Sequence, residues 1–471
     1  MSRSPARKAW KPRLAGAAGP MYRAIADALE LDVREGRLGV GDPLPTQRQL
    51  ADAIGVNFTT VTRAYAEARR RGLISARVGQ GTFVAGAGRA AVVDDDDDFD
   101  LSVNAPPTPD WMPEALRATL ERLAGDAGLQ HRMLTYASRH GDLLGVDAGV
   151  TWLRARGIAA DPSCVAVTSG AQHALSTLLR VHARPGDTVL IESLSYPGMQ
   201  APATAVGVQL IGVDIDNEGI MPDALEAACR LHAPVALFCV PTFQNPTTAV
   251  MSTARREAIL EVARKYGLRV VEDDICGPLL RERPPLLAAL APDIVTYVGS
   301  LSKCVAPGLR TAFIHTPTAD EAARVQAGVR ASILMLSPLS TAVAAAWIAD
   351  GTAERAVRDI SAETTARGVI ARRVFGEDQI RVPAGSLHAW LQLPPMWSLA
   401  GFVAQAQQRG VRVAPADWYV APTARLDGVR ATPNAVRVTL GVARDRARFT
   451  EALQRLAGVL RQAPALRASN L

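Results

Sequence analysis

Residues 299–310 read GSLSKCVAPGLR, in which a lysine stands among small residues just beyond an apolar run. That run, IVTYVGS at 294–300, predicts a buried strand, so Lys303 is expected at a strand end. The chain has four lysines among its 52 basic residues, namely Lys8, Lys11, Lys265 and Lys303. Arginine fills the usual surface positions, and its guanidinium cannot form a Schiff base. Lys303 is therefore a candidate for covalent carbonyl chemistry rather than an ordinary surface lysine.

Six more apolar runs of strand length flank this stretch and alternate with helical segments. Continuous apolar strands separated by helices predict an α/β fold whose mostly parallel sheet lies between helices. Polar residues gather at the ends of these runs, and in open α/β sheets that edge is where ligands bind. Residues from about 370 onward predict a smaller α+β domain. The runs are CVAVTS at 164–169, TVLIES at 188–193, VQLIGV at 208–213, VALFCV at 235–240, LRVVED at 268–273 and TAFIHT at 311–316, and the helices between them include 171–183, 222–231 and 254–266.

Residues 20–84 contain three helical segments and a short pair of strands. Apolar residues near helical spacing predict a helix over 20–36, and Thr46 and Gly55 predict the start and the end of a second helix. A third helix is predicted over 58–72, and the LISARVGQGTFV that follows predicts a β-wing. This order indicates a winged helix-turn-helix. The alternative is a small helical domain without a role in DNA binding.

Positive charge is concentrated in the first fifth of the chain. Lys plus Arg is 52 and Asp plus Glu is 46, a net charge of +6. Residues 1–90 carry 15 basic and 7 acidic side chains, a balance of +8, so the remaining residues carry −2. This asymmetry indicates a nucleic-acid-binding module on a near-neutral domain. Residues 1–19 are predicted as a basic tail, and residues 85–100, with Asp94–Asp98, as an acidic linker that is either a solvated spacer or a segment that repels DNA or covers the basic domain.

Composition narrows the class of protein. Apolar residues make up 48% and charged residues 21% of the chain, which is typical of a globular protein, and the length predicts two to four domains. No apolar run is long enough to cross a membrane and no secretory signal pattern is present, so we expect a cytoplasmic location. The five cysteines are scattered, without a CxxC or Cys/His cluster, so neither a disulfide framework nor a metal site is expected.

Two sequence patterns carry a resemblance to a known family: LPTQRQLADAIGVNFTTVTRAY with GQGTFV, and SLSK followed after six residues by Arg310. Residues 20–84 resemble a GntR-type winged helix. Residues 100–445 resemble a fold-type-I aminotransferase, a class that uses pyridoxal 5'-phosphate (PLP) bound to a lysine. A chain that joins the two is similar to the MocR family of bacterial transcriptional regulators. The resemblance implies a large PLP-binding domain at 101–369 and a small domain at 370–471.

The resemblance assigns cofactor roles residue by residue. Lys303 matches the lysine that bonds to PLP, and Asp273 matches the carboxylate that keeps the pyridine nitrogen protonated, the alternative being an aspartate that caps a loop. Tyr196 matches the aromatic residue that stacks on the ring, although a tyrosine before proline is also common in turns. Asn245 matches the donor to the phenolic oxygen, before a Pro246 that is a candidate for a cis peptide bond. The phosphate is expected at a helix N-terminus, and its matching ligands are Ala171, Gln172, Ser300, Ser302 and Arg310.

Two more residues match the family, and Cys276 and Phe58 are among the positions that depart from it. Arg437 matches the arginine that grips a substrate α-carboxylate. Tyr136 matches a tyrosine that reaches the phosphate of the neighbouring subunit, which implies a homodimer. Cys276 lies where a tyrosine usually bonds to the phenolic oxygen, which argues against efficient transamination. Phe58 lies where an arginine often begins the recognition helix and reads a guanine, so an unusual base preference is expected.

The resemblance also implies that the winged helix contacts double-stranded operator DNA. The sequence leaves open whether Arg48 and Arg63 contact phosphates or bases. The implied DNA-binding residues are Arg48, Thr59, Thr60, Arg63 and Gly79.

Three functions are consistent with these residues. The first is a transcriptional regulator whose PLP-binding domain senses an amino compound or PLP itself and reorients paired winged helices. The second is a working aminotransferase of an amino acid that carries an accessory winged helix. The third is a DNA-binding regulator that no longer holds PLP. We favour the first, because Lys303, Asp273 and Arg437 are present while Cys276 departs from the enzyme pattern.

Overall fold

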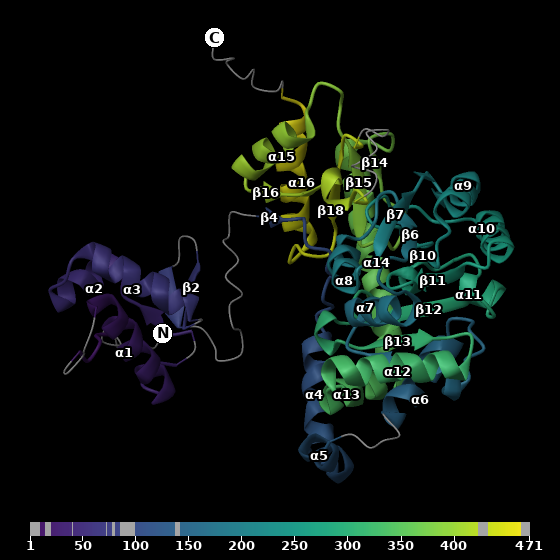
Figure 1. The fold of residues 1–471 in the computed structure, drawn as a ribbon. Coiled ribbons are helices and arrows are strands. Elements are labelled where there is room, and N and C mark those ends of the chain that lie inside the picture. The colour runs from purple at the N-terminus through teal and green to yellow at the C-terminus, as the bar shows by residue number, and fades with distance from the viewer. Residues whose placement is uncertain are drawn as a thin grey trace. The chain divides into compact units, whose positions relative to one another are not determined.

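A computed structural model of the chain describes residues 10–14, 20–39, 41–71, 73–77, 81–84, 99–136, 142–422 and 432–462. The chain divides into two compact units, Met1–Asp98 and Phe99–Leu471, whose elements are labelled in Figure 1. Gly79 and Asp94–Asp98, which the sequence singled out, lie outside the described residues.

The first unit is a winged helix, in which three helices accompany a small antiparallel sheet in the order β1-β3-β2. The Thr46 side chain accepts the N–H of Gln49 at 3.3 Å, and Gln49 Oε1 accepts the N–H of Thr46 at 3.0 Å, so the second helix starts with a capping box. Gly55 ends that helix in the left-handed conformation, with φ 70°. Both predicted helix boundaries are confirmed. The elements are α1 (Met21–Arg34), β1 (Pro43–Leu44), α2 (Gln47–Ile54), α3 (Phe58–Arg70), β2 (Ile74–Arg77) and β3 (Gly81–Val84).

Trp10 belongs to the core of this unit, although it lies within the predicted basic tail 1–19. Its side chain is 9% exposed, and its indole Nε1 donates to Asp32 Oδ2 at 2.7 Å. Arg37 Nε donates to the other oxygen of Asp32 at 2.7 Å. The tail is therefore not wholly outside the fold. No sequence pattern indicated this contact, because one isolated tryptophan forms no periodic pattern.

The second unit is built on a seven-stranded sheet in the order β5-β13-β12-β11-β10-β6-β7. Strand β13 is antiparallel to both of its neighbours, and the other pairings in this sheet are parallel. Each strand lies within one of the seven predicted runs, so the predicted α/β fold with its mostly parallel sheet is confirmed. The strands are β5 (Val165–Thr168), β6 (Thr188–Glu192), β7 (Gln209–Val213), β10 (Ala236–Cys239), β11 (Arg269–Asp273), β12 (Val295–Ser300) and β13 (Ala312–His315).

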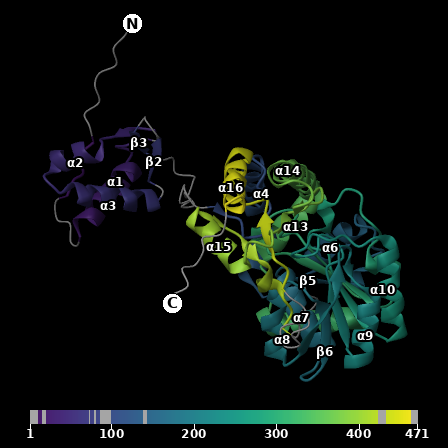
Figure 2. The same cartoon turned by 90° about the horizontal axis from the view of Figure 1, so that it is seen from above.

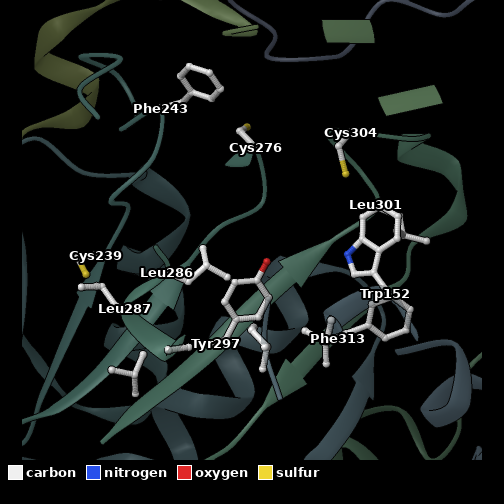
Figure 3. Close-up of a cluster of buried hydrophobic side chains, with 14 of the residues drawn as sticks. Trp152, Cys239, Phe243, Cys276, Leu286, Leu287, Tyr297, Leu301, Cys304 and Phe313 are labelled. Carbon is white, nitrogen blue, oxygen red and sulfur yellow. The ribbon is translucent and has the colours of Figure 1, made fainter. Parts of the chain in front are cut away.

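Helices cover both faces of this sheet (Figures 1 and 2). One core contains residues of α6, α9, α10, α11 and α13, and the opposite core contains residues of α7, α8 and α12. Figure 3 shows part of the first core, where Trp152 lies beside Phe313 and Tyr297 stands on its strand. Because both faces are buried, the strands are apolar without alternation. These elements are α4 (Met112–Ala124), α5 (Ala127–Leu134), α6 (Leu143–Arg154), α7 (Ala171–His182), α8 (Gln200–Val206), β8 (Ile215–Asp216), β9 (Gly219–Ile220), α9 (Pro222–His232), α10 (Thr253–Lys265), α11 (Leu287–Leu290), α12 (Ala319–Ile333) and α13 (Pro338–Ala349).

The smaller C-terminal part is an antiparallel sheet in the order β14-β15-β18-β17 with helices packed beside it. Phe99–Asp100, placed in the linker by the sequence, forms strand β4 and pairs with β16, so these two residues belong to the second unit. The expected boundary between 369 and 370 falls inside one continuous helix, α14 (Thr352–Phe375). No change in composition marks a boundary within α14. The remaining elements are β14 (Ile380–Arg381), β15 (His388–Gln392), α15 (Leu399–Gln408), β16 (Val411–Arg412), β17 (Ala414–Pro415), β18 (Ala435–Thr439) and α16 (Arg446–Leu460).

Two features are absent from the described residues. No helix in this part of the chain combines the length and the apolar character needed to span a membrane. No group of three or more His, Cys, Asp or Glu side chains there is arranged to hold a metal ion.

Candidate functional site

The candidate site lies where β11 and β12 end. These strands are parallel neighbours, so Asp273 at the end of β11 and Ser300 at the end of β12 lie at the same edge of the sheet. Lys303 follows β12 directly, and its amine interacts electrostatically with Asp273, Arg310 and Arg437. The fold therefore brings together residues that the sequence places far apart.

Lys303 is a partly buried amine. Its Nζ donates a hydrogen bond to the main-chain carbonyl of Asn104. Burial lowers the pKa of this amine because the ammonium form loses its water, and the nearby guanidinium of Arg437 lowers it further. A lowered pKa increases the share of neutral amine, which is the nucleophilic form.

Asp273 is a buried carboxylate with an unused acceptor. Its side chain is 6% exposed, and its Oδ1 has no hydrogen-bond partner among the described residues. Burial, and then the charge of Asp274, raise the pKa of Asp273 to about 7, although the Lys303 ammonium acts in the opposite direction. A protonated ring nitrogen placed against Oδ1 would satisfy the free acceptor and favour the ionised carboxylate.

Gly170 lies against the guanidinium of Arg310, which is connected to two serine hydroxyls. This glycine has φ 83°, and a Cβ added to it would lie 2.5 Å from a guanidinium nitrogen of Arg310. Arg310 donates to Ser302 Oγ at 3.4 Å and to the carbonyl of Ser169 at 3.3 Å. Ser300 Oγ donates to Ser302 Oγ at 3.2 Å. A guanidinium and two hydroxyls around an open glycine suit an oxyanion such as a phosphate group.

The start of α7 adds backbone donors to this cradle. The N–H groups of Ala171 and Gln172 belong to the first helical turn, where no intrahelical acceptor is available and the helix dipole favours an anion. Gln172 Nε2 donates to the carbonyl of Gly198 at 2.7 Å. A Cβ on Gly198 would lie 2.2 Å from the Tyr196 ring, so the missing side chain lets that ring lie against the backbone. Tyr196 is 38% exposed, which leaves ring surface for a planar group to stack on.

Arg437 on β18 carries a buried positive charge that no carboxylate of the described residues pairs with. Its guanidinium donates to Asn245 Oδ1 at 2.8 Å and to the carbonyl of Ser102 at 2.6 Å, and it lies 5.2 Å from the centre of the Tyr419 ring. It is 6% exposed, and burial lowers its pKa. Because an uncompensated buried charge is unfavourable, this position suits an incoming carboxylate. The Asn245–Pro246 peptide bond is cis, as predicted.

Two residues that the sequence singled out, Tyr136 and Cys276, do not take part in the site as the others do. Tyr136 follows α5 and is 81% exposed, so a single chain does not bring it to the site, and its contact with a neighbouring subunit stays a prediction. Cys276 is buried near Lys303, and burial raises the pKa of its thiol to about 12. A neutral thiol is only a weak donor, so Cys276 does not replace the hydrogen bond of a tyrosine hydroxyl.

The sequence missed four residues of the site: Ser102, Asn104, Glu192 and His388. Ser102 and Asn104 act through main-chain carbonyls, which no side-chain pattern reveals. His388 is fully buried with its Nδ1 3.5 Å from Asn104 Nδ2, and burial lowers its pKa to about 3, so the ring is neutral. Burial raises the pKa of Glu192 to about 7. The position of Glu192 at the end of a predicted strand was the one sequence signal that could have identified it.

Four of the five predicted DNA-binding residues belong to the described part of the first unit. Arg48 on α2 and Thr59 and Arg63 on α3 are exposed, whereas Thr60 is half-buried. Phe58, the first residue of α3, is 49% exposed. The opposite face of α3 packs into the core through Val61, Ala64, Tyr65 and Ala68.

Comparison with known proteins identifies both units. Residues 21–84 match the family described as bacterial regulatory proteins, gntR family, and residues 96–456 match aminotransferase class I and II. The uncharacterized HTH-type transcriptional regulator YdeF of Bacillus subtilis is 31% identical over 415 residues, which cover 87% of this chain and 89% of that protein. This chain is a member of the MocR-type family of transcriptional regulators.

Other similar proteins agree with this family. The vitamin B6 salvage pathway transcriptional repressor PtsJ of Salmonella typhimurium is 27% identical over 440 residues, covering 91% of this MocR-type chain and 96% of PtsJ. Among solved structures, LysN, an α-aminoadipate aminotransferase from Thermus thermophilus complexed with N-(5'-phosphopyridoxyl)-L-leucine, has a TM-score of 0.68 and 26% identity, covering 77% of this chain and 92% of that chain. The resemblance predicted from the sequence is confirmed.

Proposed function

We propose that this MocR-type regulator binds PLP at the edge formed by β11 and β12 and uses it to sense an amino compound or PLP itself. When bound, PLP supplies an electron-poor ring and an aldehyde carbon that reacts with amines. Lys303 is the protein amine for that carbon. Asp273, whose buried Oδ1 lacks a partner among the described residues, holds a proton at the ring nitrogen. The donors around Gly170, with Arg310 among them, hold the phosphate.

The same site has a place for the carboxylate of an amino compound. Arg437 presents a planar guanidinium that can bind a carboxylate through two parallel hydrogen bonds. Asn245, which now accepts one N–H of Arg437, keeps its amide N–H groups for the ring oxygen of the cofactor. Tyr196 offers its exposed ring surface to the cofactor ring.

The observation that supports the sensing role is a pair of hydrogen bonds to one short segment. Lys303 Nζ donates to the carbonyl of Asn104, and Arg437 donates to the carbonyl of Ser102. This segment continues from β4 (Phe99–Asp100), where the second unit begins after the linker. A ligand that bonds to Lys303 and pairs with Arg437 takes over these donors, so both carbonyls lose a partner. Ligand binding therefore changes the segment that leads to the winged helix, and it shifts the regulator only by favouring one of its arrangements.

A homodimer is the proposed DNA-binding form. Large apolar side chains are exposed on α4, at and just beyond the end of α5, and at the start of α6, and such a surface is typical of a protein interface. A second copy would cover it and would carry Tyr136 toward the neighbouring phosphate cradle. Two winged helices would then bind two half-sites of double-stranded operator DNA in the cytoplasm. The exposed residues are Leu116, Leu120, Met133, Leu134, Tyr136, Leu143 and Leu144.

The test combines cofactor binding with DNA binding. Purified full-length protein is titrated with PLP and followed by visible absorbance, and its affinity for a duplex from upstream of its own gene is measured with and without PLP and amino acids. Lys303→Ala is compared with Lys265→Ala, because Lys265 is an exposed lysine paired with Glu226 at 2.6 Å. We expect the wild type and Lys265→Ala to gain a band and to change DNA affinity, and Lys303→Ala to do neither.

Other outcomes would favour the alternatives. A wild-type protein that binds DNA and gains no absorbance band with PLP would favour a regulator without the cofactor. Steady transfer of amino groups between an amino acid and a 2-oxo acid would favour a working aminotransferase with an accessory winged helix. Failure to bind any duplex at moderate salt would contradict the regulatory role.

A further inference from the structure

Phe58 is an apolar side chain placed where a helix-turn-helix meets bases. In this motif the N-terminal residues of the second helix contact base edges in the major groove. Phe58 is the first residue of α3, the second helix of the motif, and 49% of it is exposed. Among the described residues of α2 and α3, it is the only large apolar side chain that is exposed.

Phe58 is not part of the hydrophobic core of the first unit. The core face of α3 is formed by other residues, among them Val61 and Tyr65. The helix start is organised by Asn57, whose Oδ1 accepts the N–H of Thr59 at 2.9 Å. Phe58 contributes to the helix through its main-chain carbonyl, which accepts the Thr62 hydroxyl at 3.0 Å. The fold would keep these interactions with almost any side chain at position 58.

Hydroxyl groups beside Phe58 are already engaged within the protein. Thr59 Oγ1 donates to Asn57 Oδ1 at 2.9 Å, and Thr62 Oγ1 donates to Gln47 Oε1 at 2.9 Å. The ring itself has no hydrogen-bond donor for the O6 and N7 acceptors of a guanine. The thymine methyl group is the one apolar group that base pairs present in the major groove.

We propose that Phe58 contacts the 5-methyl group of a thymine and so makes an A·T pair specific at one position of each half-site. This inference rests on the proposed DNA-binding function and adds a base identity to it. Burial of the methyl group against the ring supplies the discrimination, so the contact distinguishes thymine from uracil as well as from cytosine.

The experiment removes the methyl group alone. Full-length protein selects duplexes from a random-sequence library, and each enriched thymine is then replaced singly by deoxyuridine. For the wild type we expect one position per half-site at which the replacement weakens binding about fourfold, the value expected for one buried methyl-sized group. For Phe58→Ala we expect wild-type melting behaviour and no effect of deoxyuridine at that position. Leu31→Ala is the matched control, because Leu31 is an equally exposed apolar residue (51%) on α1.

The outcomes separate the two proposals. A library that yields no enriched sequence overturns the DNA-binding function, and the Phe58 contact with it. An enriched sequence in which no deoxyuridine replacement weakens binding overturns the contact alone. A deoxyuridine effect of the same size in Phe58→Ala and in the wild type also overturns it.

Discussion

Replacing Asp273 by asparagine should stabilise the cofactor-free protein at alkaline pH and weaken the binding of PLP. The carboxylate is 6% exposed and its Oδ1 lacks a partner among the described residues. Burial raises its pKa from the ordinary 3.8 to about 7. A carboxyl group with a raised pKa in the folded state makes no unfavourable contribution below pH 3.8, and stability is lost as the pH rises from there to about 7. Asparagine keeps the shape of the side chain and does not titrate.

The size of the effect follows from the two pKa values. At 1.36 kcal/mol per pH unit, the step from 3.8 to about 7 corresponds to roughly 4 kcal/mol at alkaline pH and roughly 1.5 kcal/mol at about pH 5. The amide of asparagine is also buried without partners, at a constant cost of about 1–3 kcal/mol. The reliable signal is therefore the pH dependence: the stability of Asp273→Asn relative to the wild type should increase by roughly 3 kcal/mol between about pH 5 and pH 8.

Denaturant unfolding of the second unit in the cofactor-free protein, followed at both pH values, measures this difference. Asp378→Asn is the matched control, because Asp378 is an exposed aspartate of the same unit. In the same preparations Asp273→Asn should bind PLP roughly ten- to a hundredfold more weakly, because a charge-assisted hydrogen bond is lost. A relative stability of Asp273→Asn that does not change with pH would refute the assignment of a buried ionisable acid at this position.

Three further predictions use other parts of the structure. Gly170→Ala should reduce PLP affinity without unfolding the protein, because the new Cβ would lie 2.5 Å from the guanidinium of Arg310, and an absorbance titration measures the loss. Thr46→Ala should lower the stability of the first unit by about 1 kcal/mol through loss of the capping box, whereas Thr59→Ala should leave that box intact; differential calorimetry distinguishes them. Arg48→Ala and Arg63→Ala distinguish phosphate contacts from base contacts. If the arginine contacts a phosphate, its loss should reduce the slope of log binding constant against log salt concentration by about one; if it contacts a base, its loss should change the base preference instead. Arg461→Ala in the second unit is the control.

Local patterns in the sequence were enough to predict the sheet and its functional edge. Each of the seven buried strands carries its own apolar run, and the caps at Thr46 and Gly55 act within a few residues of themselves. Lys303 was recognisable because lysine is scarce in this chain. These features depend on neighbouring residues, so the sequence contains them directly.

The contacts that complete the site depend on the folded chain. Lys303 and Asn104 lie 199 residues apart, and the acceptor is a main-chain carbonyl that every residue type provides. The same holds for Ser102, which is separated from Arg437 by 335 residues. The contact of Trp10 was missed for a related reason. Its partner Asp32 lies on α1, and the sequence pattern predicted that helix from its apolar residues alone. Most side chains of the candidate site could be predicted, whereas its backbone partners could not.

The unsatisfied polar atoms of the second unit are a source of free energy for the conformational change that we propose. Interior polar groups are nearly always hydrogen-bonded, yet Asn104 Oδ1, Gln172 Oε1, Asp273 Oδ1 and Arg437 Nε are buried at this one site without partners among the described residues. Each such group disfavours the cofactor-free fold by about 1–3 kcal/mol. A ligand that satisfies several of them gains that free energy only in the arrangement that places them around it. In the proposed function, ligand binding acts through the carbonyls of Ser102 and Asn104 and favours one arrangement of the segment that follows the linker.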